Sequence, residues 1–342
     1  MSEAKIAEPI VVTGATGFIG RRVVKRLVSQ GYKPHAFVLP QDALPKEWAD
    51  GVQVTRGDMT DRASVDAAIK DSATVIHLAA VVGDWGAEDL HQRVTVEGTR
   101  HVLAATAANG ARALLASSVV VYGDQIGHAT CHEDHPHGRA LGPYSRSKQA
   151  QERIALELEA SASLRVTIIR PSNVYGPASA PWVDSTVAQL RSGGPCLVGG
   201  GEQNAGLVYV DNVVDFFIRV AERPESVGRT FNLCDDLDVT WKRYFSDLSK
   251  LCGAGAPKSI PRFVASMAAS VMERTYKILK REQRPDITHE ALNLVGSNHR
   301  IPIDKARAEL GFEPRVGYEE AMKRIAAYID EHLGAQGAGE GS

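Results

Sequence analysis

Three glycines near the N-terminus, Gly14, Gly17 and Gly20, are spaced as G-x-x-G-x-x-G. The β-branched run 10–12 precedes them, and residues 23–28 follow with apolar side chains at helical spacing. In such a strand–turn–helix connection, glycines permit a tight turn and let a pyrophosphate approach the free N–H groups at the start of the helix. A glycine turn without a ligand is the alternative, and the strand and helix around the turn favour dinucleotide binding.

Apolar runs and helical patterns alternate along the first half of the chain. We expect strands at 10–12, 35–39, 52–56, 74–78, 113–117 and 165–169, and helices at 63–70, 89–109 and 144–160. Continuous apolar runs are typical of parallel strands that helices cover on both faces. The predicted fold class is therefore α/β: a Rossmann doubly wound parallel sheet with a smaller, mostly helical C-terminal substrate domain.

The alternation of strands and helices breaks after Pro171, which indicates a second domain. We assign 9–172 and a returning segment, 206–234, to the dinucleotide-binding Rossmann domain. Residues 173–205 and 236–330 are assigned to the substrate domain. The Gly-rich polar tail 334–342 is expected to be disordered.

Charge and cysteine content exclude several classes of protein. Of the 342 residues, 39 are Lys or Arg and 41 are Asp or Glu, so the net charge of −2 gives no basis for nucleic-acid binding. The four cysteines lie far apart, which argues against a disulfide framework and fits a reducing cytoplasm. The chain has neither an apolar signal region at its start nor a run of 18 apolar residues, so no spanning helix is expected.

Tyr144 and Lys148 stand four residues apart at the start of an expected helix, where they share one face. A nearby ammonium lowers the pKa of a phenol, which would let Tyr144 act as a general base on an alcohol. Ser117 and Ser118 end the preceding strand, and a hydroxyl there can stabilise charge on a substrate oxygen. A surface Tyr–Lys pair and a serine that only caps the strand end are the alternatives.

Residues after the expected second strand bear on the identity of the dinucleotide. An acidic side chain there binds a ribose hydroxyl, whereas arginine binds a 2′-phosphate. Asp42 would serve if its loop turns back toward the glycines; Arg21 and Arg22 would either serve a phosphate or be exposed. The sequence slightly favours NAD over NADP. Asp58 is expected at the adenine amino group or, alternatively, as a helix cap or turn residue.

Two further segments suggest binding sites. A loop carries the potential metal ligands His128, Cys131, His132, His135 and His137, but their spacing fits no standard zinc pattern, so we predict no metal.

Residues 260–280 form an amphipathic, cation-rich pattern that suits either contact with a membrane surface or packing on the rest of its domain. Its apolar character favours an apolar substrate.

Taken together, several segments make the sequence resemble the extended short-chain dehydrogenase/reductase family over residues 9–330. These segments are 13–20 (TGATGFIG), 57–58 (GD), 77–80 (HLAA), 96–99 (VEGT), 117–123 (SSVVVYG), 144–148 (YSRSK) and 170–177 (RPSNVYGP). The family implies homodimers through 89–109 and 144–160. Counting back from Gly123, its catalytic hydroxyl falls on Ser118, which acts with Tyr144 and Lys148.

The resemblance also implies binding residues. Those expected at the cofactor are Gly14, Thr16, Gly17, Phe18, Ile19, Asp58, Met59, Ala79, Ala80, Tyr144, Lys148, Pro171 and Asn173. Those expected at the substrate are Ser118, Val119, Tyr144, Asn173 and Tyr209.

Within the family, the segments 83–86 (GDWG), 208–214 and 304–314 resemble the 3β-hydroxysteroid and sterol-4α-carboxylate dehydrogenase branch. The function expected is an NAD(P)-dependent oxidoreductase that interconverts a secondary alcohol and a ketone on an apolar substrate, a 3β-hydroxysteroid or a sterol-4-carboxylate. Oxidation of the latter would give a β-keto acid that can lose CO₂. The alternatives are a 2-alkyl-3-ketoalkanoate reductase, a nucleotide-sugar 4-epimerase and a non-catalytic dinucleotide-sensing regulator.

Three positions depart from family patterns. Thr95 stands where an Asn usually supports a helix kink and a relay water. The segment 204–207 lacks the arginine of nucleotide-sugar enzymes, which argues against a diphosphate-bearing substrate. Val119 stands where dehydratases have an aspartate, which argues against dehydration.

Overall fold

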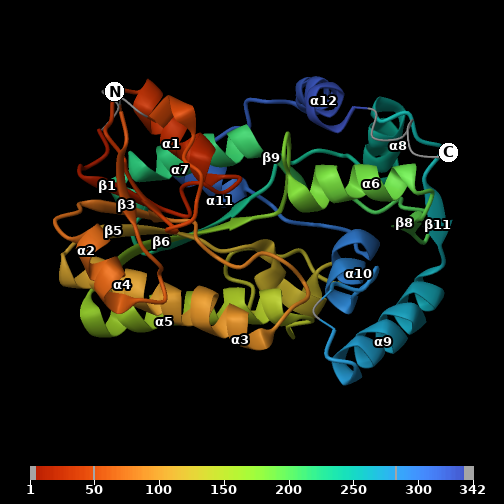
Figure 1. The fold of residues 1–342 in the computed structure, drawn as a ribbon, viewed down its shortest axis with the longest axis horizontal. Helices are drawn as coiled ribbons and strands as arrows, with labels where there is room; N and C mark the ends of the chain where they lie inside the picture. The colour runs from red at the N-terminus through yellow and green to blue at the C-terminus, as the bar shows by residue number, and fades with distance from the viewer. Residues whose placement is uncertain (1–4, 49–50, 282, 335–342) are drawn as a thin grey trace.

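The computed structural model describes residues 5–48, 51–281 and 283–334. Its main sheet has seven parallel strands in the order β10-β6-β5-β4-β1-β2-β3 (Figure 1). The strands of this sheet are β1 (Ile10–Thr13), β2 (His35–Val38), β3 (Gln53–Arg56), β4 (Thr74–His77), β5 (Arg112–Ala116), β6 (Arg165–Pro171) and β10 (Arg229–Leu233).

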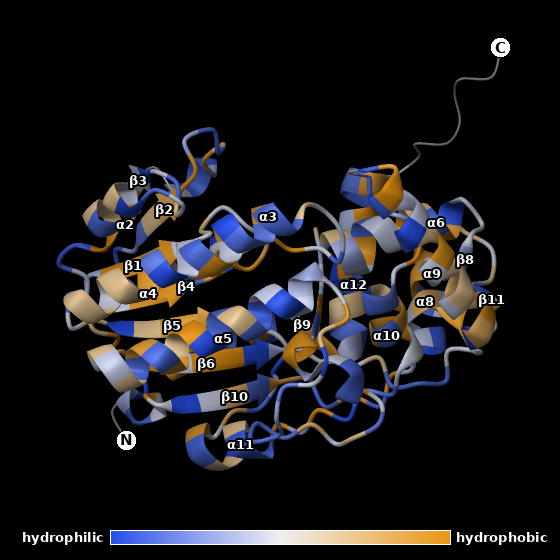
Figure 2. Ribbon diagram, turned by 90° about the horizontal axis from the view of Figure 1, so that it is seen from below, coloured by the Kyte–Doolittle hydropathy of each residue, from blue (hydrophilic) through white to orange (hydrophobic). Residues whose placement is uncertain are grey.

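Helices cover both faces of this sheet, as Figure 1 shows. On one face lie α1 (Gly20–Ser29), α7 (Val210–Ala221) and α11 (Asp304–Leu310); on the other lie α2 (Arg62–Ile69), α4 (Gly98–Ala108) and α5 (Pro143–Ala162). Every residue of β1, β4 and β5 is buried, and the middle of the sheet is coloured hydrophobic in Figure 2. Strands buried on both faces explain the continuous apolar runs in the sequence, and the predicted α/β fold class is confirmed.

A second, smaller and mostly helical unit adjoins the carboxyl edge of the sheet. Its core gathers aromatic side chains of the helix 241–251 with Tyr175 and residues of the helices 185–191 and 318–328. The remaining elements are β7 (Asn173–Tyr175), β8 (Pro195–Val198), β9 (Leu207–Tyr209), β11 (Lys258–Ile260), α3 (Glu88–Leu90), α6 (Ser185–Arg191), α8 (Trp241–Leu251), α9 (Arg262–Ile278), α10 (His289–Gly296) and α12 (Tyr318–Tyr328). Short 3₁₀ segments span Lys46–Trp48, Val119–Gln125 and Pro224–Ser226, and π-helical segments span His91–Glu97, Ala180–Asp184 and Ile329–Leu333.

The expected single helix 89–109 is wrong in one respect. The chain forms α3, then the π-helical segment His91–Glu97, then α4. Inside the π-helical segment, the buried Thr95 hydroxyl accepts a hydrogen bond from the backbone N of Val81 at 2.9 Å. Hydropathy does not register such a tertiary contact, and π-helical turns are often found where a helix borders a functional site.

The range predicted for the substrate domain, 236–330, also contains a segment that packs with the sheet. Ile303, Ala306, Leu310 and Phe312 share one buried core with β1, β6, α1 and α7. This segment around α11 is therefore part of the sheet's own packing. The domain boundaries otherwise stay a prediction, and residues 335–342 of the predicted tail lie outside the described residues.

Candidate active site

The predicted site residues gather where four neighbouring strands end. The glycine loop follows β1, Ala79 and Ala80 follow β4, Ser118 follows β5, and Pro171 ends β6. In open α/β sheets, ligands bind in the crevice at the carboxyl ends of the strands. The fold therefore brings residues more than a hundred positions apart to one edge.

The glycine loop is too crowded for side chains at two of its glycines. Gly14 has a φ of +64°, and a Cβ there would lie 2.8 Å from the Cα of Ala79. A Cβ on Gly20 would lie 2.1 Å from the carbonyl oxygen of Gly14. The loop thus leads directly into the N-terminus of α1, where backbone N–H groups suit a pyrophosphate. Its shape fits the dinucleotide predicted from the spacing.

The loop after β2 turns back toward these glycines. Asp42 Oδ2 accepts a hydrogen bond from the Thr16 hydroxyl at 2.5 Å. Arg56 holds the turn by donating to the carbonyl oxygens of Leu39, Pro40 and Asp42 at 3.2, 2.7 and 3.1 Å. The condition under which Asp42 could reach a ribose is therefore met.

The cations considered for a 2′-phosphate are placed differently. Arg22 donates to the carbonyl oxygens of Phe18 and Pro177 at 2.7 and 2.6 Å and lies 3.8 Å from an Asp211 oxygen. The Arg22 guanidinium is therefore engaged by two backbone carbonyl oxygens and a carboxylate of the protein itself. Asp58 Oδ1 accepts from the backbone N of Thr60 at 2.8 Å and so stabilises the turn after β3, and its role at the adenine stays a prediction. Asp61 rather than Asp58 caps α2.

The proposed catalytic side chains meet between β5 and α5. Lys148 is buried, donates to the carbonyl oxygen of Ala116 at 2.9 Å, and its Nζ lies 5.7 Å from the centroid of the Tyr144 ring. Interaction with the Ser118 side chain lowers the pKa of the Tyr144 phenol. Ser118 also accepts from the backbone N of Val120 at 3.3 Å, so it caps the following turn as well.

The neighbouring serine faces another partner. The Ser117 hydroxyl donates to Glu152 Oε1 at 2.5 Å, within the buried layer between β5 and α5. Ser118, and not Ser117, therefore lies with Tyr144. The assignment of the catalytic hydroxyl to Ser118, which the resemblance implies, stays a prediction.

The sequence predicts a lowered pKa for Tyr144. In the structure, the groups around the phenol raise its pKa. Burial, and then the charge of Glu290, raise the pKa of Tyr144, and the interaction with Ser118 only partly opposes them. Burial also lowers the pKa of Lys148 to about 7, while Glu152 raises it. Without a bound cofactor, the phenol is therefore held in its protonated form.

Glu290, at the start of α10, was not predicted as a site residue. It is 3% exposed, and its Oε1 accepts from the backbone N of Ser145 at 2.8 Å. No described residue donates a hydrogen bond to its Oε2. A Cβ on Gly142 would lie 1.8 Å from that oxygen, so the glycine before α5 makes room for it. Burial raises the pKa of Glu290 to about 7.

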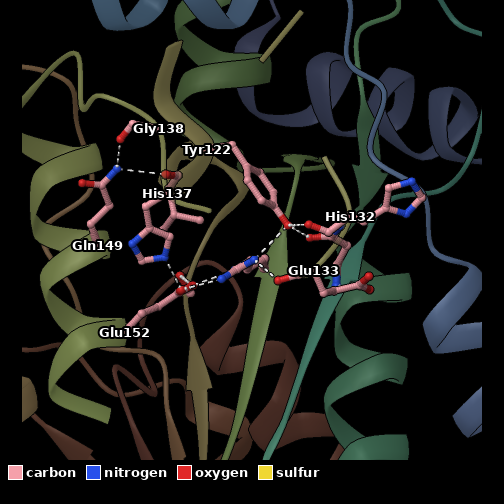
Figure 3. A network of polar contacts seen from close by, with 11 residues as sticks. Tyr122, His132, Glu133, His137, Gly138, Gln149 and Glu152 are labelled. Atoms are coloured by element: carbon pink, nitrogen blue, oxygen red, sulfur yellow. Dashed lines mark hydrogen bonds and ion pairs between the residues drawn. The ribbon is translucent and has the colours of Figure 1, made fainter. Parts of the chain in front are cut away.

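Glu152 lies four residues after Lys148 on α5 and is 1% exposed (Figure 3). Arg170 donates to both of its oxygens, at 2.9 and 2.7 Å, and His137 Nε2 lies 2.7 Å from Oε2. These hydrogen bonds, with that from Ser117, hold the pKa of Glu152 at about 2. A carboxylate at this helical spacing from Lys148 is the signal that could have identified it.

The remaining residues that were predicted to contact the cofactor or the substrate have different surroundings in the structure. Asn173 Nδ2 donates to the carbonyl oxygen of Ala205 at 2.7 Å, so its amide holds the backbone. Tyr209 is 1% exposed and packs against Tyr175, with ring centroids 5.5 Å apart. Val119 and Met59 are buried, the latter in the core beneath α4. Roles of these residues at the ligand stay predictions.

The histidine-rich loop does not converge on one point. His137 faces Glu152, and the His135 ring lies against Tyr122 with centroids 6.2 Å apart. Cys131 is fully buried. Over residues 5–48, 51–281 and 283–334, no three His, Cys, Asp or Glu side chains are grouped to hold a metal ion.

Comparison with known proteins identifies the family. The profile of the NAD dependent epimerase/dehydratase family matches residues 10–234. The chain belongs to this family. The resemblance to extended short-chain dehydrogenases/reductases is thereby confirmed, as is the coarser prediction of an enzyme from an NAD-dependent oxidoreductase family.

Three similar proteins illustrate the range of this epimerase/dehydratase family. The 2-alkyl-3-oxoalkanoate reductase of Shewanella oneidensis is 27% identical, over 95% of this chain and 87% of the relative. The human decarboxylating sterol-4-alpha-carboxylate 3-dehydrogenase is 27% identical, over 93% of this chain and 87% of the relative. MoeE5, solved with UDP-glucose and NAD, is 25% identical with a TM-score of 0.75, over 95% of this chain and 100% of that one.

Proposed function

We propose that this protein interconverts a secondary alcohol and a ketone on an apolar substrate that carries a neighbouring carboxylate. The observation that carries the proposal is the gathering of Tyr144, Ser118 and the buried Lys148 at the carboxyl end of β5: Lys148 Nζ lies 5.7 Å from the centroid of the Tyr144 ring, and Ser118 lowers the pKa of the phenol. A hydroxyl and a phenol that converge on one point can share the oxygen of a carbonyl or carbinol. The third group, Lys148, adds a cation within the same buried space.

Each of the three groups has a role. Ser118 holds the substrate oxygen and stabilises its developing charge. Tyr144 moves the proton, from the alcohol in oxidation and to the ketone oxygen in reduction. Lys148 positions the ribose of the cofactor and, when charged, favours the phenolate. Bound NAD(P) would accept or supply the hydride through its nicotinamide ring.

The substrate class comes from what two relatives have in common. A 2-alkyl-3-oxoalkanoate and a sterol-4α-carboxylate with oxygen at carbon 3 both place a carboxylate on the carbon next to the one that carries oxygen. We therefore assign a β-oxo or β-hydroxy carboxylate with an apolar body. The ring system of a sterol and the open chain of an alkanoate are two members of this class. Oxidation of such a hydroxy acid gives a β-keto acid, which can then lose CO₂.

Tyr144 in its protonated form can donate a proton to a ketone oxygen. Burial and the charge of Glu290 raise the pKa of Tyr144, so the free enzyme presents a phenol that can donate a proton. The dehydrogenase direction requires that the bound cofactor lower the same pKa.

Nucleotide sugars fit the site less well. The segment 204–207 offers backbone groups where an arginine would meet a diphosphate: Asn204 Oδ1 accepts from the N of Gly206 at 2.8 Å, and the carbonyl oxygen of Ala205 accepts from Asn173. Arg binds phosphates in bidentate fashion, and nothing in this segment replaces it. The 4-epimerase alternative is therefore disfavoured.

NAD is the cofactor that Asp42 favours. Its carboxylate lies beside the glycine loop through its bond to Thr16. There it can accept hydrogen bonds from ribose hydroxyls, and it would repel a 2′-phosphate.

The test is turnover by purified protein. We expect NADH oxidation with a 2-alkyl-3-oxo acid, NAD⁺ reduction with a 3β-hydroxy-4-carboxysterol, or both, and no change in UDP-glucose. Tyr144→Phe should lower kcat/KM at least roughly a hundredfold while leaving dinucleotide binding in place. Turnover of UDP-glucose alone would support the epimerase, and dinucleotide binding without turnover of any of these substrates would support a regulatory protein. Unchanged turnover in Tyr144→Phe would overturn the role given to Tyr144.

A further inference from the structure

Helix α9 lies at the edge of the molecule, beside α10 and away from the main sheet (Figure 1). Its covered face is made of small residues: Ala265 and Ala269 are fully buried, and Ala265 packs with Leu292 of α10. The helix therefore lies close against its neighbour on one side. Its other side is free of packing partners within the described part of the chain.

Both ends of α9 are held to the rest of the protein. At its start, Arg262 donates to the carbonyl oxygen of Gly296. At its end, Trp85 Nε1 donates to the carbonyl oxygen of Arg281 at 3.3 Å, and the Trp85 ring packs edge-on against Tyr276 at 6.1 Å. These contacts fix the face that the helix presents outward.

The outward face is strongly apolar. Phe263, Met267, Val271 and Ile278 are 69%, 65%, 64% and 71% exposed. At 3.6 residues per turn these four positions fall within about 80° of one another around the helix. Contiguous exposed apolar surface of this kind marks an interaction site rather than ordinary surface.

Cations accompany the stripe. Arg274 lies within it, and Lys277, Lys280 and Arg281 follow at the same end, all exposed. The acidic residue of the helix, Glu273, accepts a hydrogen bond from the backbone N of His289 at 2.6 Å and is thus directed to α10. The face is positive although the chain has a net charge of −2.

We propose that this outward face of α9 binds an anionic lipid surface. An interfacial helix buries its apolar stripe among the acyl chains near the headgroups, while Lys and Arg bind anionic phosphates. A second copy of this chain is a poorer partner, because pairing two such faces would bring two positive surfaces together. Among the helices of the described residues, none could span a membrane.

Vesicle flotation with the full chain tests this proposal. We expect the protein to float with phosphatidylcholine vesicles that contain phosphatidylglycerol, to stay behind with phosphatidylcholine alone, and to be released by salt. Met267→Ser/Ile278→Ser should lower the floated fraction about tenfold or more. Arg274→Glu/Lys277→Glu should act likewise on anionic vesicles. Leu44→Ser, which removes an exposed apolar side chain after β2, is the matched control and should float like wild type.

Thermal unfolding of each variant shows whether it folds. Substitutions at exposed positions change stability by roughly 0.5 kcal/mol or less, so loss of flotation in a folded variant is loss of binding. The proposal is overturned if wild type does not float with anionic vesicles, or if the α9 variants float equally well. It is also overturned if sedimentation shows a wild-type dimer that the α9 variants convert to monomer, because the face would then belong to a second copy.

Discussion

The carboxylate of Glu290 accepts a hydrogen bond from the backbone N of Ser145, 2.8 Å away, and so joins α10 to the first turn of α5. Tyr144 precedes Ser145 in that turn. The same carboxylate that fixes the start of the helix thus also acts electrostatically on the phenol, whose pKa it raises. Asp84 raises the pKa of Glu290 itself and Arg146 lowers it.

Replacing Glu290 by Gln should make Tyr144 easier to deprotonate. Gln keeps an oxygen for Ser145 but removes the charge, so the rising limb of kcat/KM for alcohol oxidation should shift to lower pH by roughly one unit. Because the pKa of Glu290 is about 7, wild type and variant should differ mainly above that pH. The measurement is a pH profile of oxidation with NAD⁺.

Glu273→Gln is the matched control for this change. Glu273 also accepts a hydrogen bond from a backbone N, that of His289, but it is not among the groups that shift the pKa of Tyr144. Its pH profile should match that of wild type. Equal profiles for all three proteins would mean that Glu290 acts only as a helix cap.

The distance between residues in sequence decides which parts of this site could be predicted. The glycine loop, the strand before Ser118 and the Tyr144–Lys148 pair are short patterns within or beside single elements, and the strands and helices that carry them were predicted at their places. Glu290 comes to Tyr144 from 146 positions away through the packing of α10, and no local pattern indicates it. The direction of the Tyr144 pKa shift was missed for the same reason, since burial and a distant carboxylate set it.

The two adjacent serines after β5 give a second prediction. Ser118→Ala should lower kcat/KM roughly a hundredfold to a thousandfold, because the donor to the substrate oxygen is lost. Ser117→Ala should leave kcat/KM within a fewfold of wild type and lower the free energy of unfolding by about 1 kcal/mol, because only the bond to Glu152 is lost. Steady-state kinetics and urea unfolding of both variants measure these effects. A large loss of kcat/KM in Ser117→Ala, with little loss in Ser118→Ala, would assign the catalytic hydroxyl to Ser117.

Asp42 gives a third prediction, on cofactor choice. Asp42→Asn should raise the KM for NAD about tenfold, since a charge-assisted hydrogen bond to the ribose is weakened. The KM for NADP should fall, because the carboxylate no longer repels the 2′-phosphate. Asp61→Asn, which changes only the cap of α2, is the control and should leave both constants unaltered. An unchanged ratio of the two KM values in Asp42→Asn would remove the argument for NAD.

Thr95 departs from the family pattern and lies in the π-helical segment His91–Glu97. Because Thr95 replaces the Asn that usually supports the kink and the relay water, the sequence put the proton relay in doubt. The structure has a π-helical segment at this place, and the Thr95 hydroxyl binds the N of Val81, next to the predicted cofactor residues Ala79 and Ala80. A helix-period pattern predicts that a helix exists, and the contact of one buried hydroxyl then alters its geometry.

Glu152→Gln should destabilise the fold and do so in a pH-dependent way. The change leaves the buried Arg170 guanidinium without its counter-charge, which costs roughly 3–5 kcal/mol. The folded-state pKa of Glu152, about 2, lies below the ordinary value of 4.5, so its stabilisation is complete above about pH 4.5. It is lost as the pH falls from there toward 2. Urea unfolding at pH 7 and at pH 3 should therefore show a smaller difference in the free energy of unfolding between wild type and variant at pH 3.

Glu157→Gln is the control. Glu157 is an exposed carboxylate on the same helix that lies 3.5 Å from Arg100, and its variant should unfold with a free energy within roughly 0.5 kcal/mol of wild type at both pH values. A pH-independent difference for Glu152→Gln would mean that lost packing, and not the ion pair, accounts for it.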